Sequence, residues 1–396
     1  MMESVDQTVI FTTIEEKRGF FSLVDEKLHL AAFDTCDSRD MDKIFVGKIT
    51  NILPNLKAAF VEYKKGVCGF LPLTKEELAS YKCEMRLPVQ VVKDAVKTKE
   101  AVLSTELSLT GTYCIITSKP GGITFSKKIP APLKEELSLF CADRIEKEMT
   151  CIIRTNAASL EKEDYPLLKA EILKLEEKLQ KLLQNASGRT IYSRLYEGPS
   201  FVEKQLSKVD FKRVSKIVTD SEEEFDQISQ LIPCSLSEYL KLYEDVSFPL
   251  PALYGLRGKL HEAVSRTVWL KSGGYLVIEP TEALTVIDVN SGKNLKKISK
   301  RELTSLTNRE AAEAIPYILT SRNITGIVII DFISTDSKTE DVKLLKLLRS
   351  HTAMDYVKTD VVDITPLGLV EITRQKRDIP LKDQLCEVGL YETFRH

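Results

Sequence analysis

Two aspartates stand at the ends of short apolar runs, Asp288 in VIDVNSGKN and Asp331 in GIVIIDFI. Runs rich in β-branched residues are typical of buried strands. A carboxylate at the end of such a strand is costly unless a basic side chain, backbone donors or a hard cation such as Mg2+ compensates its charge. If the two strands are neighbours, both carboxylates could share one ion, as in a metal-dependent phosphodiester hydrolase.

Asn290 follows Asp288 by two residues and therefore lies on the same face of the expected strand. An amide in this place could orient the carboxylate or bind a scissile phosphate. The alternative is that both aspartates only cap strands or form salt bridges, which is the commoner role of strand-end aspartates. The residues by themselves leave both alternatives open.

The segments PGGITFSKK and CIIRTN contain a second group of residues suited to phosphate. Gly121 and Gly122 permit close approach of the backbone to a ligand. Arg154 offers a planar set of donors for a phosphate, and Thr155 adds a hydroxyl and a backbone donor. The alternative is that the glycines form a turn and that the arginine is solvated or paired.

Aromatic residues and lysines occur together in a third segment. The aromatic residues are Phe60, Tyr63 and Phe70, and the lysines that follow are Lys93, Lys97 and Lys99. On the surface of a barrel such side chains can stack on bases and neutralise phosphates. The alternative is that the phenylalanines belong to the core, which is the commoner place of an isolated phenylalanine.

Composition excludes several classes of protein. The chain has 396 residues, 43% hydrophobic and 29% charged, so we expect about two to four folded domains rather than disorder. A net charge of −2 means that any nucleic-acid binding depends on local basic patches. The eight cysteines form no CxxC pair, so no zinc site is expected. With neither a signal-peptide pattern nor an apolar run of the roughly 20 residues that span a bilayer, we expect a cytoplasmic protein without a membrane partner.

The first part of the chain reads as β-structure. Residues 6–33 predict a hairpin with its turn near Gly19 and Phe20. Residues 40–109 contain short strands punctuated by Gly and Pro, which fit a small barrel, with the OB-fold as the leading choice.

The later segments mix helices and strands. Residues 111–188 combine strands with a helix at 160–186, whose leucines repeat at helical spacing. Residues 189–272 again combine both kinds of element. Residues 274–396 alternate strands with helices, and this alternation argues for an α/β domain.

Three long motifs resemble a known family. The stretches EPTEALTVIDVNSGKN, TNREAAEAIPYILTSRNITGIVIIDFI and GLVEITRQKR closely resemble the catalytic core of the bacterial ribonuclease E/G family, and a weaker resemblance covers nearly the whole chain. The chain resembles a short form of this family, without its zinc link and small C-terminal domain. The resemblance implies an Mg2+-dependent endoribonuclease that cleaves single-stranded RNA, favoured by a 5′-monophosphate end, in rRNA and tRNA processing and mRNA decay.

The resemblance also implies a multidomain architecture of α+β and α/β parts. Residues 1–38 and 189–272 would form a ribonuclease H-like part. An OB-fold RNA-binding barrel at 39–110 and a 5′-end sensor region at 111–188 would be inserted into it. Residues 273–396 would form a deoxyribonuclease I-like catalytic part.

Roles for individual residues follow from the same resemblance. Asp288 and Asp331 would hold Mg2+, for which Mn2+ could substitute, and Asn290 would support them as a third catalytic residue. Arg322 and Lys358 would bind RNA near the scissile phosphate.

The resemblance assigns further residues to the two other segments. Arg154 and Thr155, with the loop that contains Gly122, would bind the 5′-phosphate. Phe60 and Phe70 would stack on RNA bases, and Lys99 would contact the RNA backbone.

The last segment departs from the longer members of the family, because it contains only Cys386 where a zinc link needs two cysteines per subunit. A zinc-linked dimer is therefore not expected, and the oligomeric state stays open. The basic run KKISKR at 296–301 could contact phosphates or be a solvated loop. Two other functions remain: a catalytically weak or inactive RNA-binding adaptor, and a metal-dependent nuclease acting on DNA.

Overall fold

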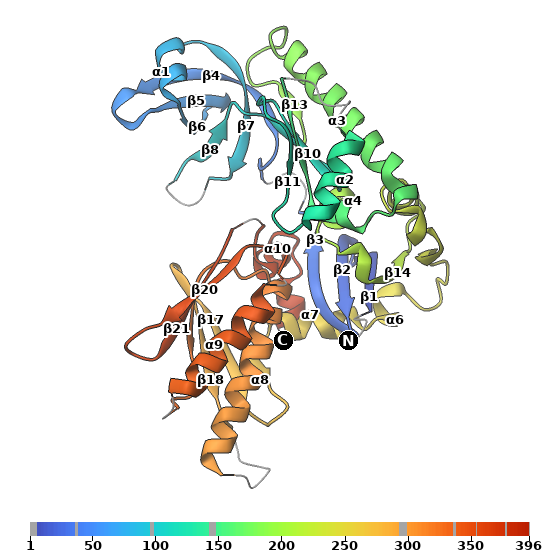
Figure 1. The fold of residues 1–396 in the computed structure, drawn as a ribbon, viewed down its shortest axis with the longest axis vertical. Coiled ribbons are helices and arrows are strands. Elements are labelled where there is room, and N and C mark those ends of the chain that lie inside the picture. The colour runs from blue at the N-terminus through green and yellow to red at the C-terminus, as the bar shows by residue number, and fades with distance from the viewer. Residues whose placement is uncertain are drawn as a thin grey trace. The chain divides into compact units, whose positions relative to one another are not determined.

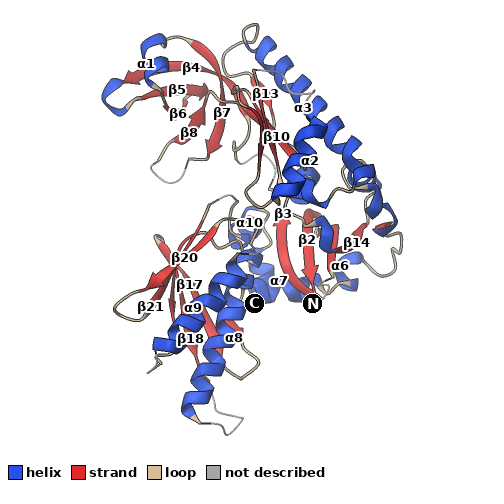
Figure 2. Ribbon diagram, viewed as in Figure 1, coloured by secondary structure: helices blue, strands red, loops and turns tan. Residues whose placement is uncertain are grey.

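The computed structural model shows a mixed α/β fold with several sheets (Figures 1 and 2). The described residues are 6–35, 39–95, 99–141, 148–292, 299–335, 338–353, 355–376 and 378–395. Their contacts divide the chain into two compact units. Unit 1 comprises Met1–Thr35, Arg213–Phe225 and Leu240–His396, and unit 2 comprises Cys36–Lys212 and Asp226–Tyr239.

The first sheet of unit 1 joins segments that are far apart in the sequence. In spatial order it contains β15 (Leu240–Leu242), β14 (Val214–Thr219), β1 (Gln7–Ile14), β2 (Lys17–Val24) and β3 (Lys27–Phe33). β1 pairs in parallel with β14, so strands from both sides of unit 2 in the sequence complete one sheet. This arrangement is compatible with the expected insertion, while the ribonuclease H-like character of the sheet stays a prediction.

The hairpin turns of this sheet lie elsewhere than predicted. β1 turns into β2 at Glu15 and Glu16, whose φ angles of 48° and 65° are those of a tight hairpin turn. The predicted turn at Gly19 and Phe20 was wrong, because both residues lie inside β2. Gly19 fits there because the ring of Phe21 occupies the space that a Cβ would need.

Helices from two parts of the chain cover this sheet. They are α6 (Leu250–Leu253), α7 (Leu256–Val264), α10 (Leu381–Glu387) and α11 (Tyr391–Arg395). Leu381, Leu385 and Phe394 of the last two helices are buried in one core with Phe21 and Leu28 of the sheet. Residues 273–396, the predicted catalytic part, therefore contribute to two different hydrophobic cores, because the last two helices bury their apolar side chains against the N-terminal sheet.

A second sheet of unit 1 contains both aspartates of interest. Its spatial order is β16 (Thr267–Trp269), β17 (Tyr275–Pro280), β18 (Leu284–Asn290), β19 (Gly326–Asp331), β21 (Leu369–Arg374) and β20 (Thr359–Ile364). β18 and β19 run parallel, whereas each of the other neighbouring pairs is antiparallel. α8 (Lys300–Ser321) and α9 (Lys338–Thr352) lie side by side on one face (Figure 1).

Residues alternate between the two faces of this sheet. Ile287 and Val289 of β18, and Val328 and Ile330 of β19, are buried in a core with the apolar side chains of α8 and α9. The residues between them leave the sheet on the opposite face. The alternation predicted an α/β packing for this segment, and the structure has it.

Unit 2 contains a closed OB-like barrel, as predicted. Its strands are β4 (Ile44–Leu53), β5 (Ala58–Lys64), β6 (Val67–Pro72), β8 (Ala101–Ser104) and β7 (Arg86–Lys93), with the short helix α1 (Lys75–Ser80) between β6 and β7. Pairing of β4 with β7 closes the barrel. β13 (Arg194–Tyr196) adds to β4 of the barrel. Residues 189–212 belong to unit 2, and not to the unit of the β1–β3 sheet, to which the predicted boundary assigned them.

A smaller sheet and a long helix complete unit 2. The sheet contains β11 (Gly122–Phe125), β12 (Thr150–Ile153), β10 (Cys114–Thr117) and β9 (Ser108–Thr110), so β9 belongs here and not to the barrel segment 39–110. The predicted helix is α3 (Tyr165–Ala186), which buries Leu168, Ile172 and Leu179. The other helices of this region are α2 (Ala131–Cys141) and α4 (Phe201–Leu206), while α5 (Glu222–Ser229) crosses from unit 1 to unit 2.

The carboxylate of Glu171 fixes α3 to the smaller sheet. It accepts hydrogen bonds from the backbone N–H groups of Thr112, Tyr113 and Cys114 at 2.7, 2.7 and 2.9 Å. Burial raises the pKa of Glu171, and the three backbone donors oppose this rise. Among the described residues no helix is long and apolar enough to cross a membrane.

Candidate active site and RNA-binding residues

Asp288 and Asp331 lie side by side. They are register partners at the ends of the parallel strands β18 and β19. Register partners point to the same face of a sheet, and adjacent strands are about 4.8 Å apart. Since the buried alternate residues face α8 and α9, both carboxylates leave the sheet on its other, open face. The structure thus brings together the two aspartates that the sequence selected.

Asn290 completes the group. Its side-chain Nδ2 donates a hydrogen bond of 2.8 Å to Oδ2 of Asp288. No hydrogen bond or ion pair reaches the Asp331 carboxylate from the residues that the structure describes. Two adjacent like charges without a basic partner favour a cation, and carboxylate oxygens are the ligands that Mg2+ prefers. The residues present therefore fit a divalent ion.

The number of protein ligands is small. Within the described part of the chain, no group of three or more His, Cys, Asp or Glu residues could hold a metal ion together. An ion at Asp288 and Asp331 would therefore keep most of its coordination positions for water or for substrate oxygens. This is the usual binding mode of Mg2+ in proteins that act on phosphates.

Asn308 of α8 fixes the chain directly after Asp331. Its Nδ2 donates to the carbonyl of Ile333 at 2.7 Å, and its Oδ1 accepts from the Ile333 N–H at 3.1 Å. The side chain is buried, with 3% of its surface exposed. Sequence reasoning missed this residue; the available signal was an asparagine within an expected helix, where this residue type is unfavourable.

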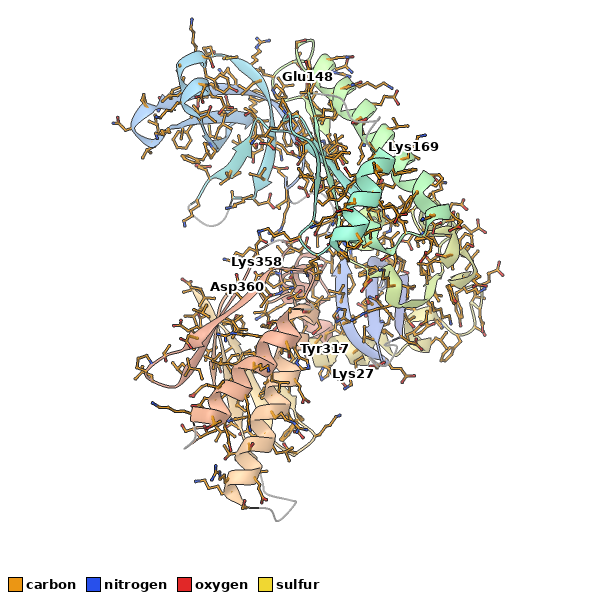
Figure 3. All side chains as sticks on the ribbon, viewed as in Figure 1. Lys27, Glu148, Lys169, Tyr317, Lys358 and Asp360 are labelled. Atoms are coloured by element: carbon orange, nitrogen blue, oxygen red, sulfur yellow. The ribbon has the colours of Figure 1, made fainter. Side chains whose placement is uncertain are left out.

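Arg322 and Lys358 lie at the other end of the sheet. Arg322 ends α8 directly before β19, and its guanidinium donates to the carbonyls of Ser265 and Glu262 at 2.6 and 3.2 Å. Lys358 precedes β20 and forms an exposed ion pair of 2.9 Å with Asp360 (Figure 3). β19 runs about 16 Å from Gly326 to Asp331, so neither basic residue stands beside the carboxylate pair.

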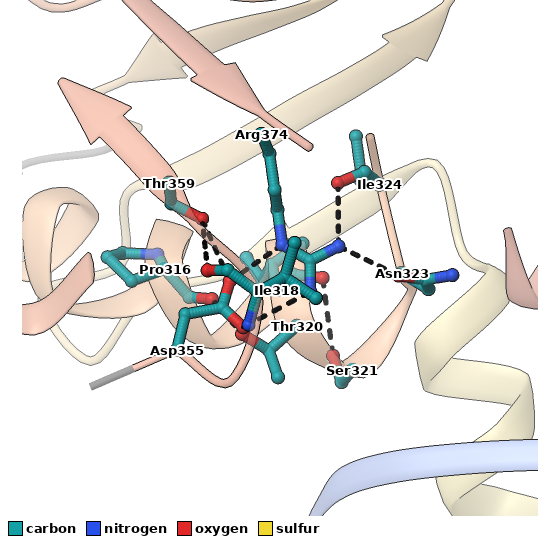
Figure 4. Close-up of polar contacts among 10 residues, drawn as sticks. Pro316, Ile318, Thr320, Ser321, Asn323, Ile324, Asp355, Thr359 and Arg374 are labelled. Atoms are coloured by element: carbon teal, nitrogen blue, oxygen red, sulfur yellow. Dashed lines mark hydrogen bonds and ion pairs between the residues drawn. The ribbon is translucent and has the colours of Figure 1, made fainter. Parts of the chain in front are cut away.

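A buried network occupies that other end of the sheet (Figure 4). Arg374 is fully buried and donates to both oxygens of Asp355, at 2.6 and 3.2 Å. It also donates to Oδ1 of Asn323 at 2.7 Å and to the carbonyl of Ile324. Thr359 donates to the same Asp355 carboxylate at 3.0 Å. Every group of this network has a partner, so its role is to hold β19, β20 and β21 together.

The residues expected at the 5′-end pocket are partly brought together. Thr155 is exposed two residues after the end of β12, and its hydroxyl lies 3.0 Å from the hydroxyl of Ser126, which follows the parallel strand β11. Arg154 binds the carbonyl of Gly111 and, at 3.3 Å, that of Ser207. A phosphate at Thr155 would therefore meet two hydroxyls first, with the Arg154 guanidinium already bound to backbone oxygens.

Gly122 lies apart from this hydroxyl pair. It is the register partner of Thr150, at the beginning of β12, whereas Arg154 follows the end of that strand. Its φ of +69° favours glycine, and a Cβ there would meet open space. The loop residue that lies next to Thr155 is Ser126 and not Gly122. Lys127 and Lys128 follow Ser126 and are exposed.

Phe60 and Phe70 lie together on the barrel. They are register partners in β5 and β6, their ring centroids are 6.1 Å apart, and both are half-buried. Phe70 and the exposed Lys93 are both register partners of Val102 in β8, which extends the row toward a positive charge. This row has the composition of a base-stacking platform.

The other members of the third segment behave differently. Tyr63 is buried, packs on Phe45 with ring centroids 5.3 Å apart and is part of the core. Lys99 is exposed, whereas Lys97 lies outside the described residues. The basic run at 296–301 is described only from Ser299, which caps α8.

The chain thus combines an open sheet face that bears paired carboxylates with an OB-like barrel. The model of the Ribonuclease E/G family matches residues 108–377, and the chain belongs to this family. Ribonuclease G of Haemophilus influenzae is 30% identical over an alignment of 372 positions, which covers 87% of this chain and 74% of that protein.

Two further relatives extend the comparison. Ribonuclease E of Nostoc sp. is 29% identical over an alignment of 355 positions, which covers 84% of this chain and 51% of that protein. Ribonuclease G of Escherichia coli K12 is 28% identical over an alignment of 367 positions, which covers 87% of this chain and 74% of that protein. The chain thus spans about half of this ribonuclease E and about three quarters of both ribonucleases G.

Proposed function

We propose that this chain is an Mg2+-dependent endoribonuclease that cleaves single-stranded RNA and prefers a 5′-monophosphate end. The observation that carries the proposal is the register pairing of Asp288 with Asp331, next to Asn290. Membership of the Ribonuclease E/G family supports RNA hydrolysis. The cellular roles of the proposed enzyme would be rRNA and tRNA processing and mRNA decay in the cytoplasm.

Asp288 and Asp331 would hold the ion, and Mn2+ could replace Mg2+. A divalent ion bound there supplies charge stabilisation for the phosphate oxygens and lowers the pKa of a bound water. Asn290 keeps the Asp288 carboxylate in one orientation through its 2.8 Å hydrogen bond. Asn308 holds the backbone after Asp331 in place through its two bonds to Ile333. The protein's own contribution is a rigid pair of ligands on an open face.

The preference for a 5′-monophosphate would depend on Thr155 and Ser126. Their hydroxyls are 3.0 Å apart, a distance at which both can donate to one phosphate. Arg154 would contribute positive charge next to them, while it remains bound to Gly111 and Ser207. Gly122 would act only through the course of the loop that leads into β11.

RNA binding by residues other than the carboxylate pair would use the barrel. Phe60 and Phe70 would stack on bases, and Lys99 would bind the RNA backbone. Arg322 and Lys358 would act on RNA at a distance from the scissile phosphate, since β19 separates them from Asp331. The proposed partner is single-stranded RNA; a zinc-linked dimer is not part of the proposal, and the oligomeric state stays open.

A second candidate function is a catalytically weak or inactive RNA-binding adaptor. The observation that favours it is the position of Arg322 and Lys358, because it leaves the carboxylate pair without a described basic residue beside it. Such a protein would keep the aromatic row of the barrel and bind RNA without hydrolysing it.

The deciding experiment uses a fluorescent single-stranded RNA with a 5′-monophosphate and its 5′-hydroxyl twin, with Mg2+ or with EDTA. The proposal requires internal cleavage that depends on Mg2+ and is faster for the monophosphate. Binding without cleavage would favour the adaptor instead. Equal rates for the two RNAs would retain the nuclease and contradict the end preference. A single-stranded DNA of the same sequence checks the third alternative, a nuclease that acts on DNA.

A further inference from the structure

Trp269 is unusually exposed. It is the only tryptophan of the chain, and 72% of its surface is accessible. Tryptophan is highly buried on average, and large exposed apolar groups often mark binding sites. Its neighbours differ, because Leu270 is buried in the core of the sheet and Val268 packs against that core. Strand alternation therefore turns Trp269 away from the core.

Tyr275 of β17 lies beside Trp269. The two residues are register partners, and their ring centroids are 5.2 Å apart with planes inclined by 52°. Such a distance and tilt are typical of a favourable aromatic pair. The pair forms one apolar surface at the edge of the sheet, on β16 and β17.

This surface is continuous with the carboxylate pair. Tyr275 is also the register partner of Asn290, whose amide binds Asp288. Register partners share a face, so Trp269, Tyr275 and Asn290 form one row across three adjacent strands, on the face that bears Asp288 and Asp331. The Cα atoms of Trp269 and Asn290 are two strand spacings apart, about 10 Å.

We propose that Trp269 and Tyr275 stack on a nucleobase of the RNA substrate next to the scissile phosphate. This inference rests on the proposed function, because it takes the carboxylate pair as the place of cleavage. A stacked base would fix the nucleotide beside the ion-binding carboxylates without reading its identity, since every base has an aromatic face. The exposed Lys271, two residues after Trp269, provides a charge for the adjoining phosphate.

The single tryptophan allows a direct binding test. The full chain in EDTA is titrated with single-stranded RNA, and tryptophan emission is recorded at an excitation that tyrosine does not absorb. Anisotropy of labelled RNA measures binding independently. We expect a saturable change of emission that follows the anisotropy. Binding with unchanged Trp269 emission would overturn the inference.

A kinetic test locates the base. Substrates carry one abasic nucleotide at successive positions around the cleavage point. We expect Trp269→Ala to raise KM roughly tenfold with little change in kcat, and one abasic position to raise KM for the wild type but not for this variant. Trp269→Phe should bring KM most of the way back to the wild-type value. Phe248→Ala, at a residue of unit 1 that is 50% exposed, is the matched control.

The outcomes separate the two proposals. Cleavage with unchanged KM in Trp269→Ala would contradict the stacking site alone. A change of tryptophan emission on RNA binding, without any cleavage, would contradict the proposed nuclease and retain the aromatic pair as an RNA-binding surface.

Discussion

Asp288 and Asp331 are register partners in adjacent parallel strands, and both carboxylates leave the sheet on the face away from α8 and α9. In a parallel pair, the carboxyl ends of both strands lie at the same edge of the sheet, so the two side chains stand at the same height. In an antiparallel pair, the two carboxyl ends would lie at opposite edges. The pair therefore requires no loop to bring its members together. Asn290 and Asn308 then restrict the conformations of the two strand ends.

Replacing one carboxylate by an amide should abolish cleavage. Asp288→Asn and Asp331→Asn each remove one of the two charges that would hold the ion, so we expect kcat to fall about 100-fold or more. RNA affinity measured by anisotropy should stay within about a factor of two to three of the wild type, which is roughly the error with which the effects of independent mutations add. Asp360→Asn on β20 is the control, since it removes the same charge from an exposed residue of the same sheet. Undiminished cleavage by either site variant would refute the mechanism.

The hydroxyl of Thr155 should matter only for the RNA end. Thr155→Val keeps the shape and removes one donor to the phosphate, so the rate ratio between 5′-monophosphate and 5′-hydroxyl RNA should fall about tenfold. The rate on the 5′-hydroxyl RNA should not change. Thr190→Val is the control, because Thr190 is also exposed and shares a 2.9 Å hydroxyl contact with Ser193. An unchanged ratio would remove Thr155 from the pocket.

Asn308 should act on catalysis through position. Asn308→Ala leaves the N–H and C=O of Ile333 without their partners, which costs about 1–3 kcal/mol of stability and loosens the backbone after Asp331. We expect kcat to fall by about tenfold or more and a higher Mg2+ concentration to be needed for half-maximal rate, with KM for RNA unchanged.

Asn323→Ala is the matched control for Asn308. Asn323 is equally buried, at 4% exposure against 3%, and its amide donates to the carbonyl of Ile379 at 2.9 Å. Asn323 lies at the end of β19 opposite to Asp331, so its loss should lower stability without changing kcat or the Mg2+ requirement. The same kinetic defect in both variants would mean that Asn308 has only a structural role.

The buried ion pair should dominate the stability of the second sheet. Arg374→Met removes the guanidinium that balances the charge of the buried Asp355 carboxylate, and we expect a loss of about 3–5 kcal/mol in the free energy of unfolding. Lys358→Met breaks the exposed pair with Asp360 and should cost no more than about 1 kcal/mol. Denaturant titration followed by circular dichroism measures both, and equal losses would contradict the assignment.

His29 should make stability depend on pH. Burial lowers the pKa of His29 to about 4, the Asp355 carboxylate opposes this shift, and Arg213 adds to it. The unfolded chain, with an ordinary histidine pKa near 6.5, binds the proton first as pH falls. The contribution of His29 to the free energy of unfolding is therefore constant above pH 6.5 and is lost as the pH falls from about 6.5 to 4. The loss amounts to about 2 kcal/mol at pH 5.

His29→Gln should remove this part of the pH dependence. The comparison is the difference in free energy of unfolding between wild type and variant at pH 7.5 and at pH 5. Carboxylates that titrate at lower pH contribute equally to both proteins and cancel. A difference that stays constant between the two pH values would contradict a neutral buried His29.

Alternation along strands made much of the site predictable. Asp288 and Asn290 stand two residues apart at the end of one apolar run typical of a strand, so alternation places both on one face, and Asp331 ends a second such run. That the two strands are neighbours in register comes from the structure alone. The positions of Arg322 and Lys358 were not accessible, because a linear sequence does not say at which end of a strand a flanking side chain finds its partner. The same holds for Gly122 and Ser126, which stand at opposite ends of β11.

Long-range packing explains the other differences. The apolar residues of α10 and α11 are recognisable as buried, but their choice of the N-terminal sheet depends on an exposed edge at β3, where Gln384 accepts a 2.9 Å hydrogen bond from Phe33 N–H. The turn at Glu15 and Glu16 lacks the glycine or asparagine that signals a tight hairpin. Trp269 was not selected because a single aromatic residue in a strand gives no sign of which face it occupies.

The alternation of β19 gives the carboxylate pair a strict parity. One residue inserted or deleted between Gly326 and Asp331 would turn every side chain that follows the change to the opposite face, sending Asp331 toward α8. A change directly after Gly326 would also expose Val328 and Ile330. A change of two residues would restore the face but shift Asp331 along the strand by about 7 Å relative to Asp288. Length variation is therefore compatible with this site only outside β19, in segments where the count of residues does not set the direction of a side chain.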